Sequence, residues 1–173
     1  MRAQKLLKPA RPLLAKTLFE KGANHDAGAE LSRVIDEYKR AIAELPEGLT
    51  AAELSDYTSL ATAHELIGDG AEMKASYERL VAKAKPSDDV ADRLALAWAF
   101  FKLHRSDDAE REIDLVLRSW PNHPEAISIR AHFAEAAGKR EEASEAFRKA
   151  FAIDRSLEMA RDGIKRMRLQ EKK

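Results

Sequence analysis

Small and apolar side chains recur along this chain at a period of about 34 residues, which is too long for one helix and fits a pair of helices. The clearest case comes from laying residues 90–123 over residues 124–157. Four pairs then coincide, namely Ala97 with Ala131, Ala109 with Ala143, Ile113 with Phe147, and Val116 with Ala150. Residues 54–87 carry Ala61, Met73, Tyr77 and Leu80 at the same four places. The pattern predicts three successive units, each made of two antiparallel helices.

Turn and capping residues mark the boundaries of these predicted helices. Gly68, His104 and Gly138 follow the first helix of each unit, where glycine allows the left-handed backbone that ends a helix. Polar residues suited to capping precede the first helices, namely Thr50 with Glu53, Ser87 with Asp88 and Asp89, and Asn122 with Glu125. The capping signals are independent of the packing pattern and indicate the same boundaries.

The period and the order of residue types resemble the tetratricopeptide repeat (TPR) family. In that pattern small residues let helices approach closely, and larger apolar residues fill the space between successive pairs. Three residues depart from it: Arg93 and Arg130 stand where apolar residues are expected, and Arg155 stands where proline is common. The resemblance implies an all-α fold, a right-handed superhelical solenoid of antiparallel helix pairs with a C-terminal capping helix.

The same frame suggests how the whole chain is organised. Residues 1–9 form a basic N-terminal segment, and residues 10–173 form a single solenoid. Within it, residues 10–46 are a divergent first repeat whose two helices are joined by an extended loop around residues 23–28. Repeats then span 54–87, 90–123 and 124–157. A capping helix covers 156–170, with Ser156 as its cap and Leu157, Ala160, Ile164 and Met167 as its apolar stripe.

Composition supports helices and excludes some kinds of site. More than half of the 173 residues are Ala, Glu, Lys, Leu or Arg, and there is no cysteine, so disulfides and cysteine-based zinc sites are excluded. The net charge is zero, but residues 1–25 and 155–173 are basic and the middle is acidic. No apolar run is long enough to cross a membrane. We expect a cytoplasmic protein, while a membrane-anchored parent or an organelle-targeted form remains open.

The sequence contains no pattern typical of catalysis. Nucleotide-binding, metalloprotease and nucleophile-elbow motifs are absent. The five histidines are dispersed, and the closest two are nine residues apart, a poor spacing for two metal ligands on one helix. Adjacent carboxylates such as Asp107 and Asp108 fall in predicted first helical turns, where they stabilise the helix dipole. We therefore predict no enzyme activity, no cofactor, no metal and no small-molecule substrate.

By resemblance to the family, a partner would bind in the concave groove lined by the first helix of each unit. The candidate groove residues are Thr58, Thr62, Leu94, Trp98, Phe101, Lys102, Ile129 and His132. Burial against additional N-terminal elements is the structural alternative for Trp98, and we expect Trp120 to pack between repeats. The positions of the family's carboxylate clamp hold no suitable set of cations, which disfavours that kind of co-chaperone activity.

These observations predict an adaptor that binds a peptide or helix of another protein in its groove. One alternative is a scaffold that self-associates through its end repeats. Another is binding of nucleic acid or an acidic membrane through the basic termini, which the lack of interleaved aromatic residues there disfavours.

Overall fold

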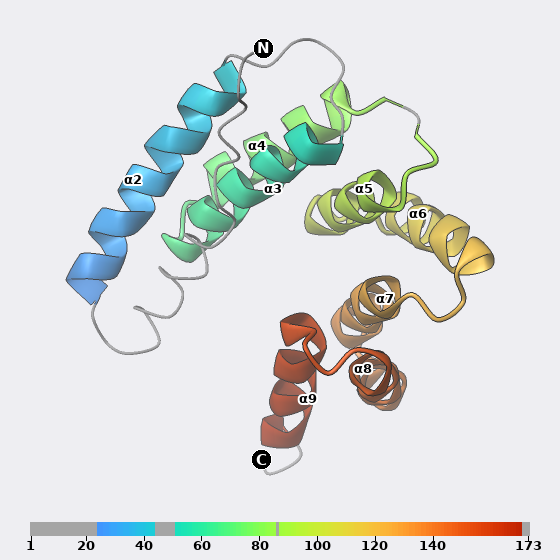
Figure 1. Cartoon of the computed structure of the whole chain (residues 1–173). Helices are drawn as coiled ribbons and strands as arrows, with labels where there is room; N and C mark the ends of the chain where they lie inside the picture. The colour runs from blue at the N-terminus through green and yellow to red at the C-terminus, as the bar shows by residue number, and fades with distance from the viewer. Residues whose placement is uncertain (1–23, 44–50, 86, 171–173) are drawn as a thin grey trace. The chain divides into compact units, whose positions relative to one another are not determined.

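The computed structural model of the chain describes residues 24–43, 51–85 and 87–170. In these ranges its regular elements are eight α-helices, labelled α2 to α9 in Figure 1. The all-α fold class is therefore confirmed. Residues 1–86 and 87–173 form two compact units, which are described separately. The single array over residues 10–173, and its repeat limits, stay predictions. Each helix in the described ranges is too short or too polar to span a bilayer.

The first unit contains α2 (Asn24–Ala43), α3 (Ala51–Leu66) and α4 (Gly70–Lys83), with α3 packed between α2 and α4. One face of α2 repeats apolar residues at helical spacing, and this face packs on α3. The buried cluster comprises Leu31, Val34, Ile35 and Tyr38 of α2 with Leu60 and Ala63 of α3. The loop predicted around residues 23–28 is wrong over residues 24–28, because these form the first turns of α2.

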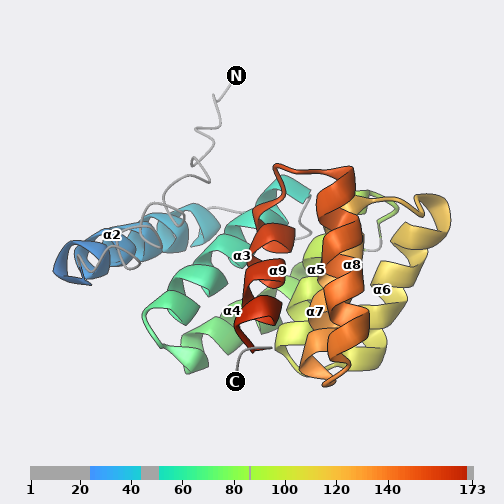
Figure 2. The same cartoon turned by 90° about the horizontal axis from the view of Figure 1, so that it is seen from below.

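The second unit contains two antiparallel helix pairs and a final helix. The first pair is α5 (Val90–Lys102) with α6 (Ser106–Ser119), and the second is α7 (Pro124–Ala136) with α8 (Arg140–Ile153). The final helix, α9 (Glu158–Gln170), packs on α8 and also contacts α7. Figure 2 shows α8 and α9 side by side. The apolar stripe predicted for the final helix is confirmed, since Leu157, Ala160, Ile164 and Met167 all lie in or pack against core clusters.

The recurring small and apolar residues lie in the cores. Ala61, Ala97 and Ala131 of the first helices are completely buried, and so are Tyr77, Ile113 and Phe147 of the second helices. Ala109, Ala143, Leu80, Val116 and Ala150 are equally inaccessible. Three of the four recurring positions are therefore fully buried in every unit, whereas at the fourth Met73 is half-buried and its counterparts Ala109 and Ala143 are buried. Burial at the three shared positions agrees with close approach of paired helices as the physical reason for the period.

The three residues that follow the first helices share one backbone conformation. Gly68 and Gly138 have φ angles of 81° and 76°, and His104 has a φ of 58°. In each turn the following residue donates its amide to a carbonyl five residues earlier, as Arg105 does to Phe100. The predicted left-handed helix ends are thus confirmed. His104 adopts this conformation although it carries a Cβ atom, which disfavours it.

The helix caps differ from the sequence-based expectation in three cases. The predicted cap at Ser87 is wrong, because Asp89 caps α5, its Oδ1 accepting from the amides of Ala91 and Asp92. The predicted cap at Asn122 is wrong, because His123 occupies the capping position of α7 without a side-chain hydrogen bond. The predicted cap at Ser156 is also wrong, since α9 begins at Glu158 and the Ser156 hydroxyl donates to Asp154 in the preceding turn. Thr50 lies outside the described residues.

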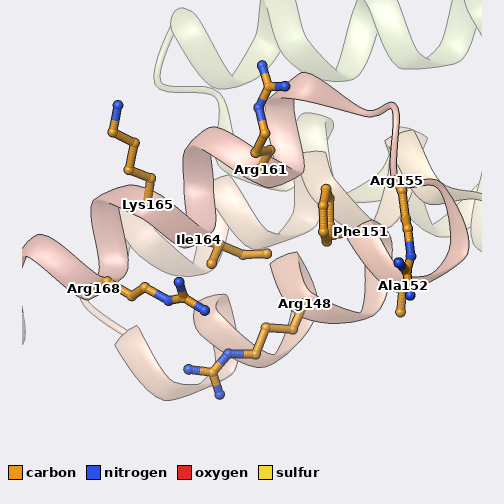
Figure 3. Close-up of a pocket in the computed structure, with 8 residues that line it drawn as sticks. All are labelled: Arg148, Phe151, Ala152, Arg155, Arg161, Ile164, Lys165 and Arg168. Atoms are coloured by element: carbon orange, nitrogen blue, oxygen red, sulfur yellow. The ribbon is translucent and has the colours of Figure 1, made fainter.

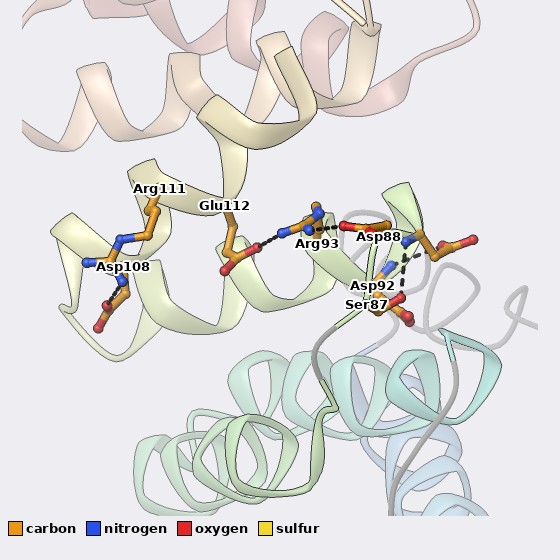
Figure 4. A network of polar contacts seen from close by, with 8 residues as sticks. Ser87, Asp88, Asp92, Arg93, Asp108, Arg111 and Glu112 are labelled. Carbon is orange, nitrogen blue, oxygen red and sulfur yellow. Dashed lines mark hydrogen bonds and ion pairs between the residues drawn. The ribbon is translucent and has the colours of Figure 1, made fainter. Parts of the chain in front are cut away.

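Two arginines that depart from the repeat pattern form ion pairs between elements. Arg93 donates to Asp88 at 2.6 Å and to Glu112 of α6 at 3.0 Å, as Figure 4 shows. Hydrogen bonds to Asp88 and Glu112 raise the pKa of the Arg93 guanidinium, so its charge is secured. Arg130 of α7 pairs with Asp114 of α6. Each apolar contact missing from the pattern is thereby replaced by an ion pair to the neighbouring helix.

Trp120 contradicts its predicted role in packing between repeats. It follows the last residue of α6, and 48% of its surface is exposed. Its backbone amide donates to Val116, but its side chain belongs to no core cluster among the described residues. Trp120 is therefore a surface residue of the second unit.

Candidate interaction surface

Three residues separated by the repeat period meet on one side of the second unit. Trp98 lies on α5, His132 on α7 and Arg166 on α9, at a spacing of 34 positions along the sequence. The Trp98 and His132 rings are 5.2 Å apart in an edge-to-face arrangement. The Arg166 Nη2 is 3.3 Å from His132 Nδ1. The first helices of successive pairs, α5 and α7, therefore place equivalent side chains in a row, and α9 occupies the position of the next first helix.

Further aromatic rings on α5 and α7 extend this row of side chains. Trp98 lies 5.6 Å from Phe101, and Phe101 lies 4.8 Å from Phe133. We call Trp98, Phe101, His132 and Phe133 the aromatic cluster. Lys102 Nζ lies 5.2 Å from the centre of the Trp98 ring, which is within the range of a cation–π contact. Trp98 and Phe101 remain half-buried, so the cluster keeps an accessible aromatic edge.

His132 is held neutral by its surroundings. Burial, followed by the nearby Arg166 charge, lowers its pKa from 6.5 to about 4, although Glu135 acts in the opposite direction. Arg166 also binds Glu135 through two parallel hydrogen bonds of 3.2 and 2.9 Å. A neutral imidazole with an unprotonated Nδ1 can accept from Arg166. The electrostatics and the geometry therefore agree on an uncharged ring.

The structure brings together six of the eight predicted groove residues. These are Leu94, Trp98, Phe101 and Lys102 of α5 with Ile129 and His132 of α7. Ile129 is 4% exposed, so its predicted place on the open groove surface is wrong. It belongs to a core cluster onto which Met159 of α9 packs, because the final helix covers part of this face.

Thr58 and Thr62 lie apart from these six in the chain, on α3 of the first unit. Both are half-buried, and the Thr62 hydroxyl donates to the Thr58 carbonyl at 2.9 Å. This bond to the preceding turn satisfies the Thr62 donor within its own helix.

The chain resembles a known helical repeat protein in fold. No family model matches the sequence, and no curated protein matches it. Among solved structures it is similar to TTC0263, a thermophilic TPR protein of Thermus thermophilus, with a TM-score of 0.53 and 19% identity. The match covers 95% of this chain and 83% of that chain. The fold is TPR-like.

The repeat pattern alone does not identify two residues of this surface. Phe133 was not singled out, although it is the ring against which Phe101 packs. An arginine such as Arg166 is typical of a solvated helix face, yet it binds Glu135 and His132. Continuing the 34-residue period from His132 into α9 would have identified Arg166, because it occupies the equivalent position.

The described part of this TPR-like fold contains no group of three or more His, Asp or Glu residues placed to hold a metal. His64 is 2% exposed on α3. Burial, and then the charge of Lys39, lowers its pKa, so the ring is neutral within the core. Both His64 and His132 are thus packed side chains of helices.

Proposed function

We propose that the chain is a non-enzymatic adaptor that binds a peptide or helix of another protein over the aromatic cluster. The observation that carries this proposal is the half-buried edge of Trp98, supported from behind by core residues and flanked by Lys102. Tryptophan anchors in such settings dominate many protein interfaces, because they bury a large area with few rotatable bonds. The TPR-like fold supports the same class of role.

The adjacent charges favour a partner segment of mixed character. Lys102 lies over the Trp98 ring, while Glu135 is neutralised by Arg166. An apolar side chain could pack on Trp98 and Phe101, and an acidic group beside it could meet Lys102. This surface is therefore suited to an amphipathic segment rather than to a uniformly charged polymer.

Replacing Trp98 tests the proposal against a matched control. The protein contains two tryptophans, so Trp98→Ala can be compared with Trp120→Ala, which removes the exposed indole outside the cluster. Proteins from the native source would be captured on each variant, and their affinities then measured in purified form. We expect a true partner to bind at least about tenfold more weakly to Trp98→Ala and normally to Trp120→Ala.

Fluorescence provides the second measurement. In a Trp120→Phe background, all indole emission comes from Trp98, and a partner seated on the cluster should shift it. A partner that binds without shifting this emission and tolerates Trp98→Ala would contradict the proposed surface. Sedimentation across a concentration range distinguishes self-association, since an adaptor of this kind stays monomeric without its partner.

A further inference from the structure

A second surface of the same unit differs in character from the aromatic cluster. Between α8 and α9 lies a hollow of about 720 Å³. Phe151, Ala152 and Ile164 form its apolar lining, and five cations surround them, namely Arg148, Arg155, Arg161, Lys165 and Arg168. We call this site the basic hollow. Figure 3 shows Phe151 and Ile164 in the middle of the group, with the cationic side chains around them.

The apolar lining is fixed by the core beneath it. Phe151 packs against the buried cluster of Ile127, Ala150 and Ala160, and Ile164 packs against the cluster that contains Phe147. The docking of α9 on α8 therefore determines where these two side chains lie. A fixed apolar surface at the centre of the hollow offers a place for an apolar group of a ligand.

Four of the five cations around this surface have no ion-pair partner among the described residues. Arg161 pairs with Glu158, whereas Arg148, Arg155, Lys165 and Arg168 make no ion pair with any residue in the described ranges. By contrast, Arg93, Arg130 and Arg166 are all bonded to carboxylates of neighbouring elements. Gathering unpaired like charges around one hollow creates a positive potential that an anion would neutralise.

The chemistry of the lining restricts what could bind there. Every polar side chain of the hollow is a lysine or arginine, and these groups donate hydrogen bonds but accept none. A suitable ligand therefore has anionic acceptors arranged around an apolar group. The hydrogen-bond donors of a nucleobase would find no acceptor side chain in this lining. Phe151 is also the single aromatic ring in the lining, which disfavours stacking of successive bases.

We propose that the basic hollow binds an acidic segment of a partner protein that carries an apolar side chain. The apolar side chain would pack between Phe151 and Ile164, and flanking aspartates or glutamates would meet the arginines of both helices. A protein segment fits better than a membrane surface, because the apolar side chains lie in a hollow among cations, where a flat bilayer would not reach them. This site shares no lining residue with the aromatic cluster and does not depend on the function proposed above.

The test uses a labelled peptide of aspartate and glutamate with leucine and phenylalanine at its centre, followed by fluorescence anisotropy on the full chain. We expect the double variant Arg148→Glu/Arg168→Glu to bind about tenfold or more weakly, because two attractive contacts become repulsive. Arg118→Glu is the control outside the hollow, at an exposed arginine of α6, and its charge change equals that of the single variant Arg155→Glu. Its affinity for the peptide should remain close to that of the unmodified chain.

Two further arms separate this proposal from simple charge attraction. Arg155→Glu changes a residue in the turn after α8, outside any helix, and should also weaken binding while the helical circular dichroism is unchanged. A peptide with alanine in place of leucine and phenylalanine should bind more weakly than the original. Equal binding of the two peptides, or equal loss in Arg118→Glu, would overturn the proposal, as would tighter binding to anionic phosphatidylserine vesicles or to single-stranded RNA.

Discussion

The aromatic cluster and the basic hollow differ in how their charged side chains are paired, although α9 contacts the first and lines the second. At the aromatic cluster, Arg166 is engaged by Glu135 and His132. At the basic hollow, Arg148, Arg155, Lys165 and Arg168 surround apolar side chains without a carboxylate in the lining. The arginine at the first surface is satisfied by contacts within the chain, whereas these four cations of the second make no ion pair with a described residue.

This difference shows how one short helix can perform two tasks. Glu135 and His132 hold Arg166 of α9 against α7, while Arg161, Lys165 and Arg168 line the hollow shared with α8. Phe147 lies between these regions, with its ring 4.9 Å from His132 and so close to α9 that a Cβ added at Gly163 would lie 2.5 Å from it. The docking of α9 over Phe147 is therefore the feature on which both surfaces depend.

Acid should destabilise the aromatic cluster, and this is the largest effect that we expect. The pKa of His132 is about 4 in the folded chain, against about 6.5 when unfolded, so the unfolded state binds more protons between these values. Stability therefore falls as the pH falls through this range. The loss should be about 2 kcal/mol by pH 5 and about 3 kcal/mol by pH 4. Urea unfolding at pH 7 and pH 5 measures it.

His132→Phe isolates the contribution of this ring. The variant keeps an aromatic side chain between Trp98 and Phe147 but removes the titrating group. The difference between the free energies of unfolding at pH 7 and pH 5 should therefore shrink by about 2 kcal/mol. Trp98→Phe alters the same cluster without removing a titratable group and should leave that difference unchanged. If His132→Phe loses as much stability in acid as the unmodified chain, the aromatic cluster is not the acid-sensitive region.

Gly163→Ala should separate the docking of α9 from its helical propensity. Alanine at an interior helix position normally stabilises a protein by about 1 kcal/mol relative to glycine. Here an added Cβ would lie 2.5 Å from Cδ1 of the fully buried Phe147 ring, so the helices must move apart. We expect a destabilisation of about 2 kcal/mol in thermal or urea unfolding, together with weaker peptide binding at the basic hollow.

Gly28→Ala provides the contrasting substitution. Gly28 lies in α2, and an added Cβ there meets nothing within 4 Å. This variant should be neutral or stabilising by about 0.5 kcal/mol. If Gly163→Ala behaved in the same way, α9 would not be packed tightly over Phe147, and the distinction between the two surfaces would lose its structural basis.

Much of the fold follows from the sequence, because paired helices can approach only where side chains are small. Ala97 and Ala131 recur at one period for that reason, and Gly138 marks a turn because the backbone there is left-handed. The start of α2 was predicted less well. Gly28 suggests a loop, but packing of Leu31 and Val34 on α3 outweighs the weak helix propensity of one glycine.

The candidate sites were only partly predictable. Leu94, Trp98 and His132 meet because groove positions are set by the period. Ile129 was misassigned because sequence spacing does not show that α9 covers part of α7. The basic hollow was invisible as well, since arginines on a helix normally indicate solvated residues. Only the three-dimensional arrangement shows that Arg155 and Arg168 surround the same apolar side chains.

A smaller effect than that of Gly163→Ala is expected from the turn between α5 and α6, away from the basic hollow. His104 adopts a φ of 58°, which glycine tolerates without the steric cost of a Cβ. His104→Gly should therefore stabilise the chain by about 0.5 to 1 kcal/mol. The reverse change at the equivalent turn, Gly138→Ala, should destabilise by about 1 kcal/mol, and it isolates backbone strain because its added Cβ meets nothing within 4 Å.

Both turn variants should leave peptide binding at the basic hollow unchanged, because neither residue lines it. Urea unfolding and fluorescence anisotropy on the same samples would therefore separate stability from recognition. If peptide affinity rose and fell with the stability of these two variants, the weaker binding of Gly163→Ala would be explained by the lower stability of the whole unit. Constant affinity would leave the docking of α9 over Phe147 as the property that shapes the hollow.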